Sequence, residues 1–383
     1  MLHEMKFPVF LISIVFLSLS AIFVCLPAAG QHDNPYDTLS YENQILRITL
    51  LPPGPDNPRN SEGDFIRLRD GRIMFIYTHF TSGADDFARA HLAARFSDDG
   101  GRSWSDSSVV VLPNEGAENI MSVSLMRLKN NKIALFYLRK NSDEDCRLYL
   151  RTSRNEARTW SDPILCHFDL EGYYVTNNDR VIQLSDGRLI VPSAIHNTPE
   201  KKHFENNAEI VCHYSDNNGK KWKRSATVLK SETAVVQEPG IVELMDGRIM
   251  MFCRTDQGYQ YISFSSDRGS TWSELEPSGI VSPLSPASIE RLPSTGDLLM
   301  VWNNTRDTKR TPLTVAISRD DGITWEHVRD IETDPDGWYC YTAIDFIGDY
   351  VFLAYCAGNR KTGNGLEATR ITRLPVSWLY KKD

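Results

Sequence analysis

The sequence lacks the cysteine and histidine spacings of structural zinc sites, which argues against a zinc-stabilised fold. It also lacks an excess of positive charge, because 42 Lys and Arg against 50 Asp and Glu give a formal net charge of −8. This charge argues against nucleic acid and anionic membranes as partners. Helical periodicity is scarce beyond residue 40, which argues against a helical protein. No loop has the ligand spacing of a calcium cage, and no metal or cofactor follows from the sequence.

The amino terminus differs from the rest of the chain. Lys6 precedes an apolar run from Phe7 to Leu26, and PAAGQ then places small residues at Ala28 and Gly30, before Gln31. This order is typical of a cleaved signal peptide over 1–30. Because the run is almost long enough to span a bilayer, an uncleaved membrane anchor is the alternative. In either case we expect the folded part to be exported, in the periplasm, on the cell surface or secreted.

Seven cysteines are present, and the first, Cys25, lies within the expected signal. The other six are widely spaced, at Cys146, Cys166, Cys212, Cys253, Cys340 and Cys356. Export permits disulfides, but Cys212 and Cys253 lie in strand-like sequences, IVCHYS and MMFCRT. We therefore expect buried free thiols.

A phrase of the form Ser-x-Asp-x-Gly-x-x-Trp returns along the chain. It reads SDDGGRSW at Ser97, SDNNGKKW at Ser215, SSDRGSTW at Ser265 and SRDDGITW at Ser318, with a degenerate copy, SRNEARTW, at Ser153. The Trp returns every 50 to 62 residues, which is the length of one four-stranded propeller blade.

A second repeated motif, two strand-like runs joined by a turn, lies between the copies of the Trp motif. LRDGRIMFIY, LSDGRLIVP and LMDGRIMMF have Asp-Gly turns, and LKNNKIALFY, LPSTGDLLMVW and FIGDYVFLAY are variants. Six hairpins with five Trp turns predict an all-β fold, a six-bladed β-propeller of four-stranded antiparallel blades. Since a ring of blades must protect its first and last edges, we expect segments 41–51 and 368–380 to complete one sheet. The expected organisation is a leader over 31–40 and one propeller over 41–381.

The repeated phrase has a structural explanation. Its Asp can accept hydrogen bonds from the backbone amides of its own turn, its Gly permits a positive φ, and its Trp can pack on the neighbouring hairpin. The phrase resembles the Asp-box, or BNR repeat, of the sialidase (neuraminidase) superfamily. Asp-boxes also occur on propellers without hydrolase activity, so the repeat predicts the fold and the function needs separate support.

Polar residues recur where the inner strand leads into each hairpin. The position nine residues before the hairpin Gly, or its equivalent, is occupied in the first five blades by Glu62, Ser122, Asn178, Glu238 and Ala287. In the last blade Tyr339 lies nine residues before the Gly, and Tyr341 lies seven residues before it. Strands that only packed would be apolar here, so the ring indicates a site at the mouth of the central channel.

The resemblance implies roles for particular residues. Sialidases bind the substrate carboxylate with three arginines, because guanidinium makes paired, permanently charged hydrogen bonds. The segment MFCRTDQGYQYISFSSDRG resembles that of the second arginine and implies Arg254 as a substrate-binding residue. The segment NNTRDTKRTPLTVAISRDDG resembles that of the third and implies Arg310.

The resemblance also implies the catalytic residues. The sialidase nucleophile is a Tyr assisted by a Glu, since a neutral phenol meets less repulsion from the substrate carboxylate than an anionic carboxylate would. VVQEPGIVELMDGRI implies Glu238, and WYCYTAIDFIGDYVFLAY implies Tyr341. The general acid is an Asp on the loop after the first hairpin, where family spacing favours Asp86 over Asp85. We expect the neighbouring carboxylate to help keep this acid protonated.

The chain departs from the family pattern at the first arginine. Sialidases carry Arg-Ile-Pro before the first hairpin, but here Ser61 has the place of the arginine, with Arg59 two residues upstream and Glu62 next to it. Either Arg59 substitutes from a displaced backbone, or the clamp has only two arms. Cys356 follows LAY where many relatives have an acid.

Our interpretation is an exported, exo-acting, retaining glycoside hydrolase that removes a terminal sialic acid or related acidic sugar from a glycan or glycoconjugate. The alternatives are a hydrolase or lyase for another glycan, with Glu62, Asp86 and Glu238 as its carboxylates, and a carbohydrate-binding propeller without catalysis. Stable membrane insertion is expected only if the signal is an uncleaved anchor. Further candidates for contact with sugar hydroxyls are Asn177, Asn178, Asp179, Arg180, His196 and Asn303.

Overall fold

The computed structural model describes residues 40–42, 45–201 and 203–381. The expected signal peptide and most of the leader lie outside this part. Within the described residues, no helix combines the length and apolar character needed to cross a membrane. Regular structure in this part is almost entirely strand, apart from the four-residue helix α1 (Val376–Leu379).

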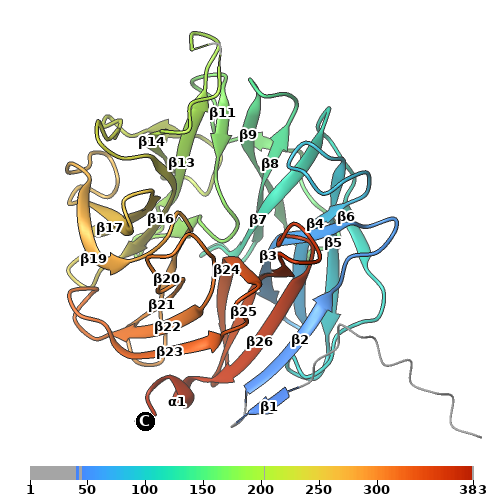
Figure 1. The fold of residues 1–383 in the computed structure, drawn as a ribbon. Helices are drawn as coiled ribbons and strands as arrows, with labels where there is room; N and C mark the ends of the chain where they lie inside the picture. The colour runs from blue at the N-terminus through green and yellow to red at the C-terminus, as the bar shows by residue number, and fades with distance from the viewer. Residues whose placement is uncertain (1–39, 43–44, 202, 382–383) are drawn as a thin grey trace, which may run out of the picture. The chain divides into compact units, whose positions relative to one another are not determined.

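The strands form six antiparallel blades arranged in a ring (Figure 1). The first blade contains β3 (Arg59–Arg67), β4 (Ile73–Phe80), β5 (Ala90–Ser97) and β6 (Val109–Leu112). The second contains β7 (Asn119–Arg127), β8 (Ile133–Lys140), β9 (Cys146–Ser153) and β10 (Ile164–Leu165). The third contains β11 (Tyr173–Val175), β12 (Ile182–Gln183), β13 (Leu189–Asn197), β14 (Glu209–Ser215) and β15 (Lys223–Arg224).

The remaining blades follow the same order from the inner strand outward. The fourth contains β16 (Val236–Glu243), β17 (Ile249–Thr255), β18 (Tyr259–Ser265) and β19 (Glu276–Val281). The fifth contains β20 (Ser288–Arg291), β21 (Leu298–Trp302), β22 (Leu313–Ser318) and β23 (Glu326–Glu332). The sixth contains β24 (Gly337–Ile347), β25 (Tyr350–Asn359), β26 (Thr369–Pro375), β2 (Ile45–Leu51) and the short β1 (Ser40–Glu42). The predicted six-bladed propeller is thus confirmed.

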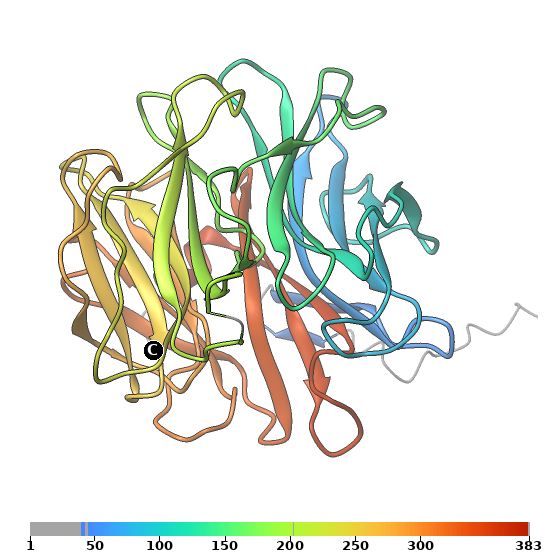
Figure 2. The same cartoon turned by 90° about the horizontal axis from the view of Figure 1, so that it is seen from above.

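The sixth blade is built from both ends of the chain, as the sequence predicted. Strand β2 pairs antiparallel with β26, in a register that places Ile48 opposite Ile371. Turned by 90° (Figure 2), the red strands of this blade lie between the blue-green strands of the first blades and the orange strands of the fifth. Because an early strand and a late strand of the chain pair in one sheet, the sixth blade closes the ring.

The core lies between neighbouring blades. Successive residues of a strand point to opposite faces, and the apolar run IMMFC of β17 is buried on both. Met251 and Cys253 pack with Ile210 of the third blade, whereas Met250 and Phe252 pack with residues of the fifth. The central strands therefore carry continuous apolar runs without the polar alternation of a half-exposed sheet.

The Asp-box turns have the structure expected of them. In the first copy, Asp99 accepts hydrogen bonds from the backbone N–H groups of Arg102 and Ser103, both at 2.9 Å, and Gly101 has φ +82°. Ser97 accepts a bond from the Gly101 N–H at 2.8 Å. These turns join the two outer strands of a blade, so they lie away from the channel and stabilise the fold.

Candidate functional site

Strained backbone marks the inner strands where they face the channel. Glu62, Ser122, Glu238 and Tyr341 have φ of 56°, 58°, 48° and 57°, and each lies in a β-bulge of its strand. Non-glycine residues in this region cost about 1–3 kcal/mol each and cluster at functional sites. All four are positions that the polar ring in the sequence singled out.

The ring prediction needs correction in two blades. In the third blade the residue with positive φ is Asp179, at 55°, and not Asn178. The inner strand there is split into β11 and β12, so the count from the hairpin is off by one residue. In the last blade Tyr341 occupies the bulge, whereas Tyr339 is buried in the core with Tyr355.

A cavity of about 180 Å³ lies where the inner strands begin. Its walls come from the first four blades and the last. The charged and polar lining residues are Glu62, Asp86, Ser122, Lys140, Asn177, His196, Gln237, Glu238, Arg254 and Tyr341. The apolar and aromatic lining residues are Met121, Leu138, Cys146, Tyr173, Val175 and Phe204. A small concave site with converging polar groups on an apolar wall is typical of ligand binding.

Tyr341 and Glu238 meet in this cavity, although 103 residues separate them in the chain. The Tyr341 hydroxyl donates a hydrogen bond to Glu238 Oε1 at 3.3 Å. Glu238 Oε2 lies 2.7 Å from Arg254 Nη1, so the carboxylate bridges a phenol and a guanidinium. Burial, followed by the charge of Glu238, raises the pKa of Tyr341. The phenol is therefore neutral at rest and has a carboxylate in place to receive its proton.

Arg254 pairs with Glu238, and Arg310 contacts the Tyr341 ring. Arg254 also donates two hydrogen bonds to Gln237 Oε1, one of them from Nε at 3.0 Å. The Arg310 guanidinium carbon lies 5.4 Å from the centre of the Tyr341 ring and 5.2 Å from that of Trp338. Two of the three arginines that the sequence implied are thus next to the phenol.

Arg59 does not line the cavity and is held by other groups. It is 1% exposed, and Nη1 donates to Asp86 Oδ1 at 2.6 Å, while Nη2 donates to Glu62 Oε1 at 2.8 Å. Nε donates to Ser61, and Nη1 also donates to the Ala84 carbonyl. A guanidinium has five N–H donors, so Arg59 is nearly saturated without a substrate. Direct substrate contact by Arg59 does not fit this conformation.

Asp86 lies at the edge of the cavity, with its side chain 58% exposed. Burial acts to raise the pKa of Asp86, but the charges of Arg59 and Lys140 outweigh it and lower the pKa below its usual value. The expectation that a neighbouring carboxylate keeps Asp86 protonated is therefore wrong for the free protein. The carboxyl of Asp85 instead accepts a hydrogen bond from the Phe87 backbone N–H at 2.9 Å.

Lys140 is a site residue that the sequence did not indicate. It is 1% exposed, ends β8, and donates from Nζ to the Asp86 carbonyl at 2.7 Å. Nζ also lies 4.6 Å from the centre of the Phe87 ring. A buried charge at the end of an otherwise apolar strand, in ALFYLRK, is the only signal that could have drawn attention to it.

The segment from 176 to 181 contacts the inner strands of other blades, and only its Asn177 lines this cavity. Asn178 Nδ2 donates to the carbonyls of Gly63 at 2.9 Å and Tyr341 at 3.0 Å, and Asp179 Oδ2 accepts from the Ile344 N–H at 2.8 Å. Arg180 Nη2 donates to the Ala287 carbonyl at 2.7 Å. Asn178 thus ties blades together and does not line the cavity.

Of the other two candidates for contact with sugar hydroxyls, His196 and Asn303, only His196 lines the cavity. Its Nδ1 is 2.8 Å from the Glu205 carbonyl. Asn303 lies elsewhere, where its side chain accepts a hydrogen bond from Ser285 and donates one to the Pro312 carbonyl. His196 therefore stays a candidate for contact with a sugar, and Asn303 has a structural role.

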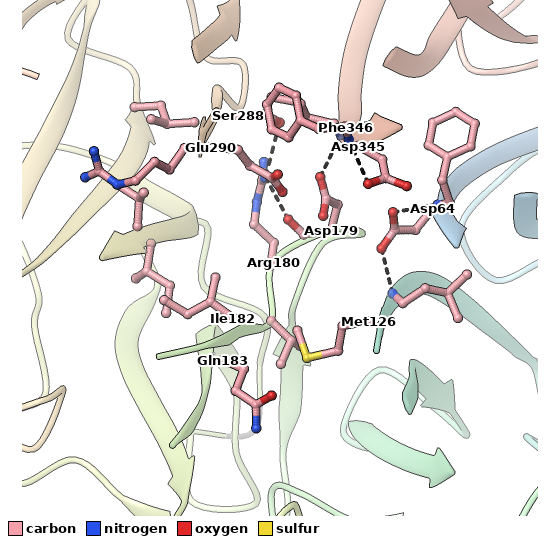
Figure 3. A pocket seen from close by; sticks show the side chains of 18 of the residues that line it. Asp64, Met126, Asp179, Arg180, Ile182, Gln183, Ser288, Glu290, Asp345 and Phe346 are labelled. Carbon is pink, nitrogen blue, oxygen red and sulfur yellow. Dashed lines mark hydrogen bonds between the residues drawn. The ribbon is translucent and has the colours of Figure 1, made fainter. Parts of the chain in front are cut away.

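A larger cavity, of about 550 Å³, lies at the opposite end of the channel. In the first four blades and the last, an earlier residue of the inner strand or its neighbouring segment lines the first cavity and a later one lines the second, for example Glu62 and Asp64; the fifth blade lines the second cavity only. Four carboxylates, those of Asp64, Asp179, Glu290 and Asp345, point into it beside Arg180 (Figure 3). Burial and the charge of Asp179 raise the pKa of Asp345 to about 7.

This acidic cavity makes stability depend on pH. The folded Asp345 carboxyl holds its proton up to about pH 7, whereas the unfolded one loses it near 3.8. Folding therefore binds a proton in this window, and the stability it contributes is lost as the pH rises. Since Asn mimics the neutral form, Asp345→Asn should melt above the wild type at pH 8 and level with it at pH 4. A melting difference that does not change with pH would contradict this, and the exposed Asp98→Asn is the control.

Neither cavity holds a ready metal site. Within residues 40–42, 45–201 and 203–381, no three His, Cys, Asp or Glu side chains are placed to hold a metal ion. The six cysteines of this part are buried and free, as predicted. What the first cavity offers is a phenol, its carboxylate partner, a second carboxylate at the rim and Arg254, while Arg310 lies against the phenol ring outside the cavity lining.

Comparison with known proteins agrees with the fold. A family model described as "BNR repeat-like domain" matches residues 111–353. A sialidase of Bacteroides fragilis (strain YCH46) is 28% identical over 213 residues, which cover 52% of this chain and 37% of that protein. The chain therefore matches well under two thirds of that relative's length.

Two solved structures have the same fold. The Hadza microbial sialidase Hz136 superposes with a TM-score of 0.70 at 18% identity, covering 87% of this chain and 69% of that one. A protein of unknown function from Dyadobacter fermentans DSM 18053 also has a TM-score of 0.70, at 16% identity, covering 88% of this chain and 98% of that one. At these identities the superpositions establish the propeller alone.

Proposed function

This chain belongs to the BNR repeat-like domain family, and from that premise we propose that it is an exo-acting, retaining, sialidase-like glycoside hydrolase. The proposed substrate is a glycan or glycoconjugate that ends in sialic acid or a related acidic sugar. We also propose that the chain is exported, on the basis of the apolar segment at its amino terminus.

The observation that carries the proposal is the contact between Tyr341, Glu238 and Arg254. In the proposed first step, Tyr341 Oη forms a bond to the anomeric carbon while its proton passes to Glu238 Oε1, at 3.3 Å. The glycosidic bond breaks as Asp86 gives a proton to the leaving oxygen. In the second step, a water molecule deprotonated by Asp86 attacks the same carbon, and Tyr341 recovers its proton from Glu238.

Arg254 and Arg310 are the proposed partners of the substrate carboxylate. Both lie next to the phenol, and a guanidinium binds a carboxylate through two parallel hydrogen bonds. Arg59, which is held by Glu62 and Asp86, acts behind the cavity as a positioning residue for the acid. The clamp in this proposal therefore has two arms.

Asp86→Asn tests the role of the acid. We expect kcat/KM for sialyllactose, which has a sugar leaving group, to fall by about 10²–10⁴-fold. An aryl sialoside should lose far less, because a phenolate leaves with little help from a proton. With sialyllactose, kcat/KM of the wild type should fall as the pH rises from 5 to 8, since Arg59 holds the Asp86 pKa low and the acid form becomes scarcer.

The matched control is Asp85→Asn, a carboxylate that neighbours Asp86 but caps its own turn. It should leave both substrates nearly unaffected. If Asp86→Asn reduced the two substrates equally, Asp86 would not be the acid.

A hydrolase for another terminal sugar is the second candidate, and the state of Arg59 favours it. Glu62 Oε1 already occupies Arg59 Nη2 at 2.8 Å, so one potential site for a substrate carboxylate is filled from within the protein. Turnover of neutral glycosides but not of sialosides by the wild type would support this candidate and refute the first.

A further inference from the structure

Two cysteines face each other directly behind the proposed nucleophile. Cys340 of β24 and Cys356 of β25 are direct partners in an antiparallel pair. Side chains of such partners lie on one face of the sheet, with Cα atoms about 4.5–5.5 Å apart, a span that a disulfide can bridge. Cys340 is the last residue in register before the bulge that presents Tyr341.

The two thiols differ in their surroundings. Cys340 faces the Cys356 thiol across the strand pair and interacts with the Arg310 guanidinium. Burial acts to raise the pKa of Cys340, but the interactions with Cys356 and with the charge of Arg310 outweigh it and lower the pKa. The interaction with Cys340 and burial raise the pKa of Cys356. A thiol of lowered pKa next to one of raised pKa is the arrangement of an attacking and a resolving cysteine.

We propose that Cys340 and Cys356 form an oxidation site in which a small peroxide converts the two thiols to a cross-strand disulfide. The Cys340 thiolate attacks one peroxide oxygen, the O–O bond breaks, and hydrogen peroxide yields a sulfenic acid and hydroxide. The Cys356 sulfur then attacks the Cys340 sulfur, and the sulfenic oxygen leaves as water with the Cys356 proton. Two thiol sulfurs are oxidised and one peroxide is reduced.

Burial selects the oxidant. Cys340 and Cys356 are 2% and 1% exposed, so a protein disulfide or another bulky reagent has no access to them in the folded state. A hydrogen peroxide molecule is nearly as small as a water molecule. The reaction therefore distinguishes small peroxides from larger thiol reagents.

The other described cysteines provide an internal comparison. Cys212 and Cys253 are also close to each other and fully buried, but burial raises the pKa of both, and no cation lies against them. Burial raises the pKa of Cys146 to about 12 despite the charge of Lys140. Cys166 has a raised pKa from burial alone. These four are therefore expected to remain thiols when Cys340 reacts.

The oxidation removes the ionisable thiol that faces Arg310. The disulfide cannot ionise and accepts hydrogen bonds only weakly, so Arg310 keeps its contacts with the Tyr341 and Trp338 rings and loses a partner that can become a thiolate. The proposal itself does not depend on the hydrolase activity, because its readout is a covalent bond.

Peptide mapping tests the proposal. The reduced full chain is treated with stoichiometric hydrogen peroxide in the folded state, then denatured, alkylated and digested. We expect a linked peptide that joins Cys340 to Cys356, with Cys146, Cys166, Cys212 and Cys253 recovered as alkylated thiols. Recovery of Cys340 and Cys356 as thiols, or a link between Cys212 and Cys253 in their place, would overturn the proposal.

Single substitutions assign the two roles. In Cys356→Ser, Cys340 should stop at the sulfenic acid, which dimedone captures when it is added together with the denaturant; in Cys340→Ser, Cys356 should stay reduced. Cys212→Ser is the matched control and should form the 340–356 link as the wild type does. If the variants at 340 and 356 fail to fold, the wild-type map still decides, because it needs no substitution. Capture of sulfenic acid at Cys356 in Cys340→Ser would contradict the assignment of the attacking sulfur.

Discussion

Tyr341→Phe is expected to lower turnover of a sialoside by at least about 10³-fold with the fold intact. The substitution removes one oxygen, which is the atom proposed to bond to the anomeric carbon. The phenyl ring keeps its place against the Arg310 guanidinium, and Glu238 keeps its ion pair with Arg254 at 2.7 Å. Only the 3.3 Å hydrogen bond to Glu238 is lost, so the change in the free energy of unfolding should be about 1 kcal/mol.

Release of a fluorophore from 4-methylumbelliferyl sialic acid measures this loss. The affinity for the glycan, measured by calorimetry, should be unchanged in Tyr341→Phe, because the two arginines remain. Tyr339→Phe is the matched control, since Tyr339 lies on the same strand but is buried in the core with Tyr355. Equal turnover in Tyr341→Phe and the wild type would reject the nucleophile, and binding without turnover by the wild type would indicate a carbohydrate-binding propeller.

Arg59→Met should cause the largest loss of stability among the site variants, about 3–5 kcal/mol in the free energy of unfolding. Met fills much of the volume of the arginine stem, but the charge is lost. Asp86 is 58% exposed and regains water, whereas Glu62 is 6% exposed and keeps only the Ser122 hydroxyl, at 2.7 Å. A buried carboxylate without its cation is the main cost.

Urea unfolding at two pH values separates this cause from a packing defect. Burial already raises the pKa of Glu62, and removal of Arg59 raises it further, so the loss should shrink at pH 4, where Glu62 takes up a proton. Arg59→Met/Glu62→Gln should recover part of the stability at pH 7. The control Arg72→Met removes an exposed ion pair with Asp70 and should cost less than about 1 kcal/mol. A loss at Arg59 that is the same at both pH values would point to packing.

The blades could be predicted from the sequence because each carries its own local signals. The Asp-box fixes the turn between two strands through bonds within about five residues, as Asp99 does with Ser103. The hairpin turns are equally local. The proximity of Tyr341 and Glu238 came from the family resemblance, and it agrees with their positions because both occupy the same bulge in their blades.

The remainder of the site could not be predicted because it depends on contacts between blades. The position of Arg59 depends on the loop from 81 to 89, whose Asp86 and Ala84 take up its donors. Lys140 belongs to the site only because β8 ends next to that loop. The four carboxylates that point into the acidic cavity come from four different blades, and in the sequence each of them alone is an isolated polar residue in or next to an inner strand. A single sequence does not show which of these positions converge.

The pairing of β2 with β26 also determines when the ring can close during synthesis and folding. Thr49 and Arg370, which contact each other across this seam, are 321 residues apart. As the chain emerges from the ribosome or across a membrane, β2 is among the first strands to appear and its partner is among the last. The long loop makes this pairing slow to find, so ring closure should be a late step in folding. Until then the nascent protein carries an open strand edge, and its risk of misassembly depends on how quickly β26 is synthesised and pairs with β2.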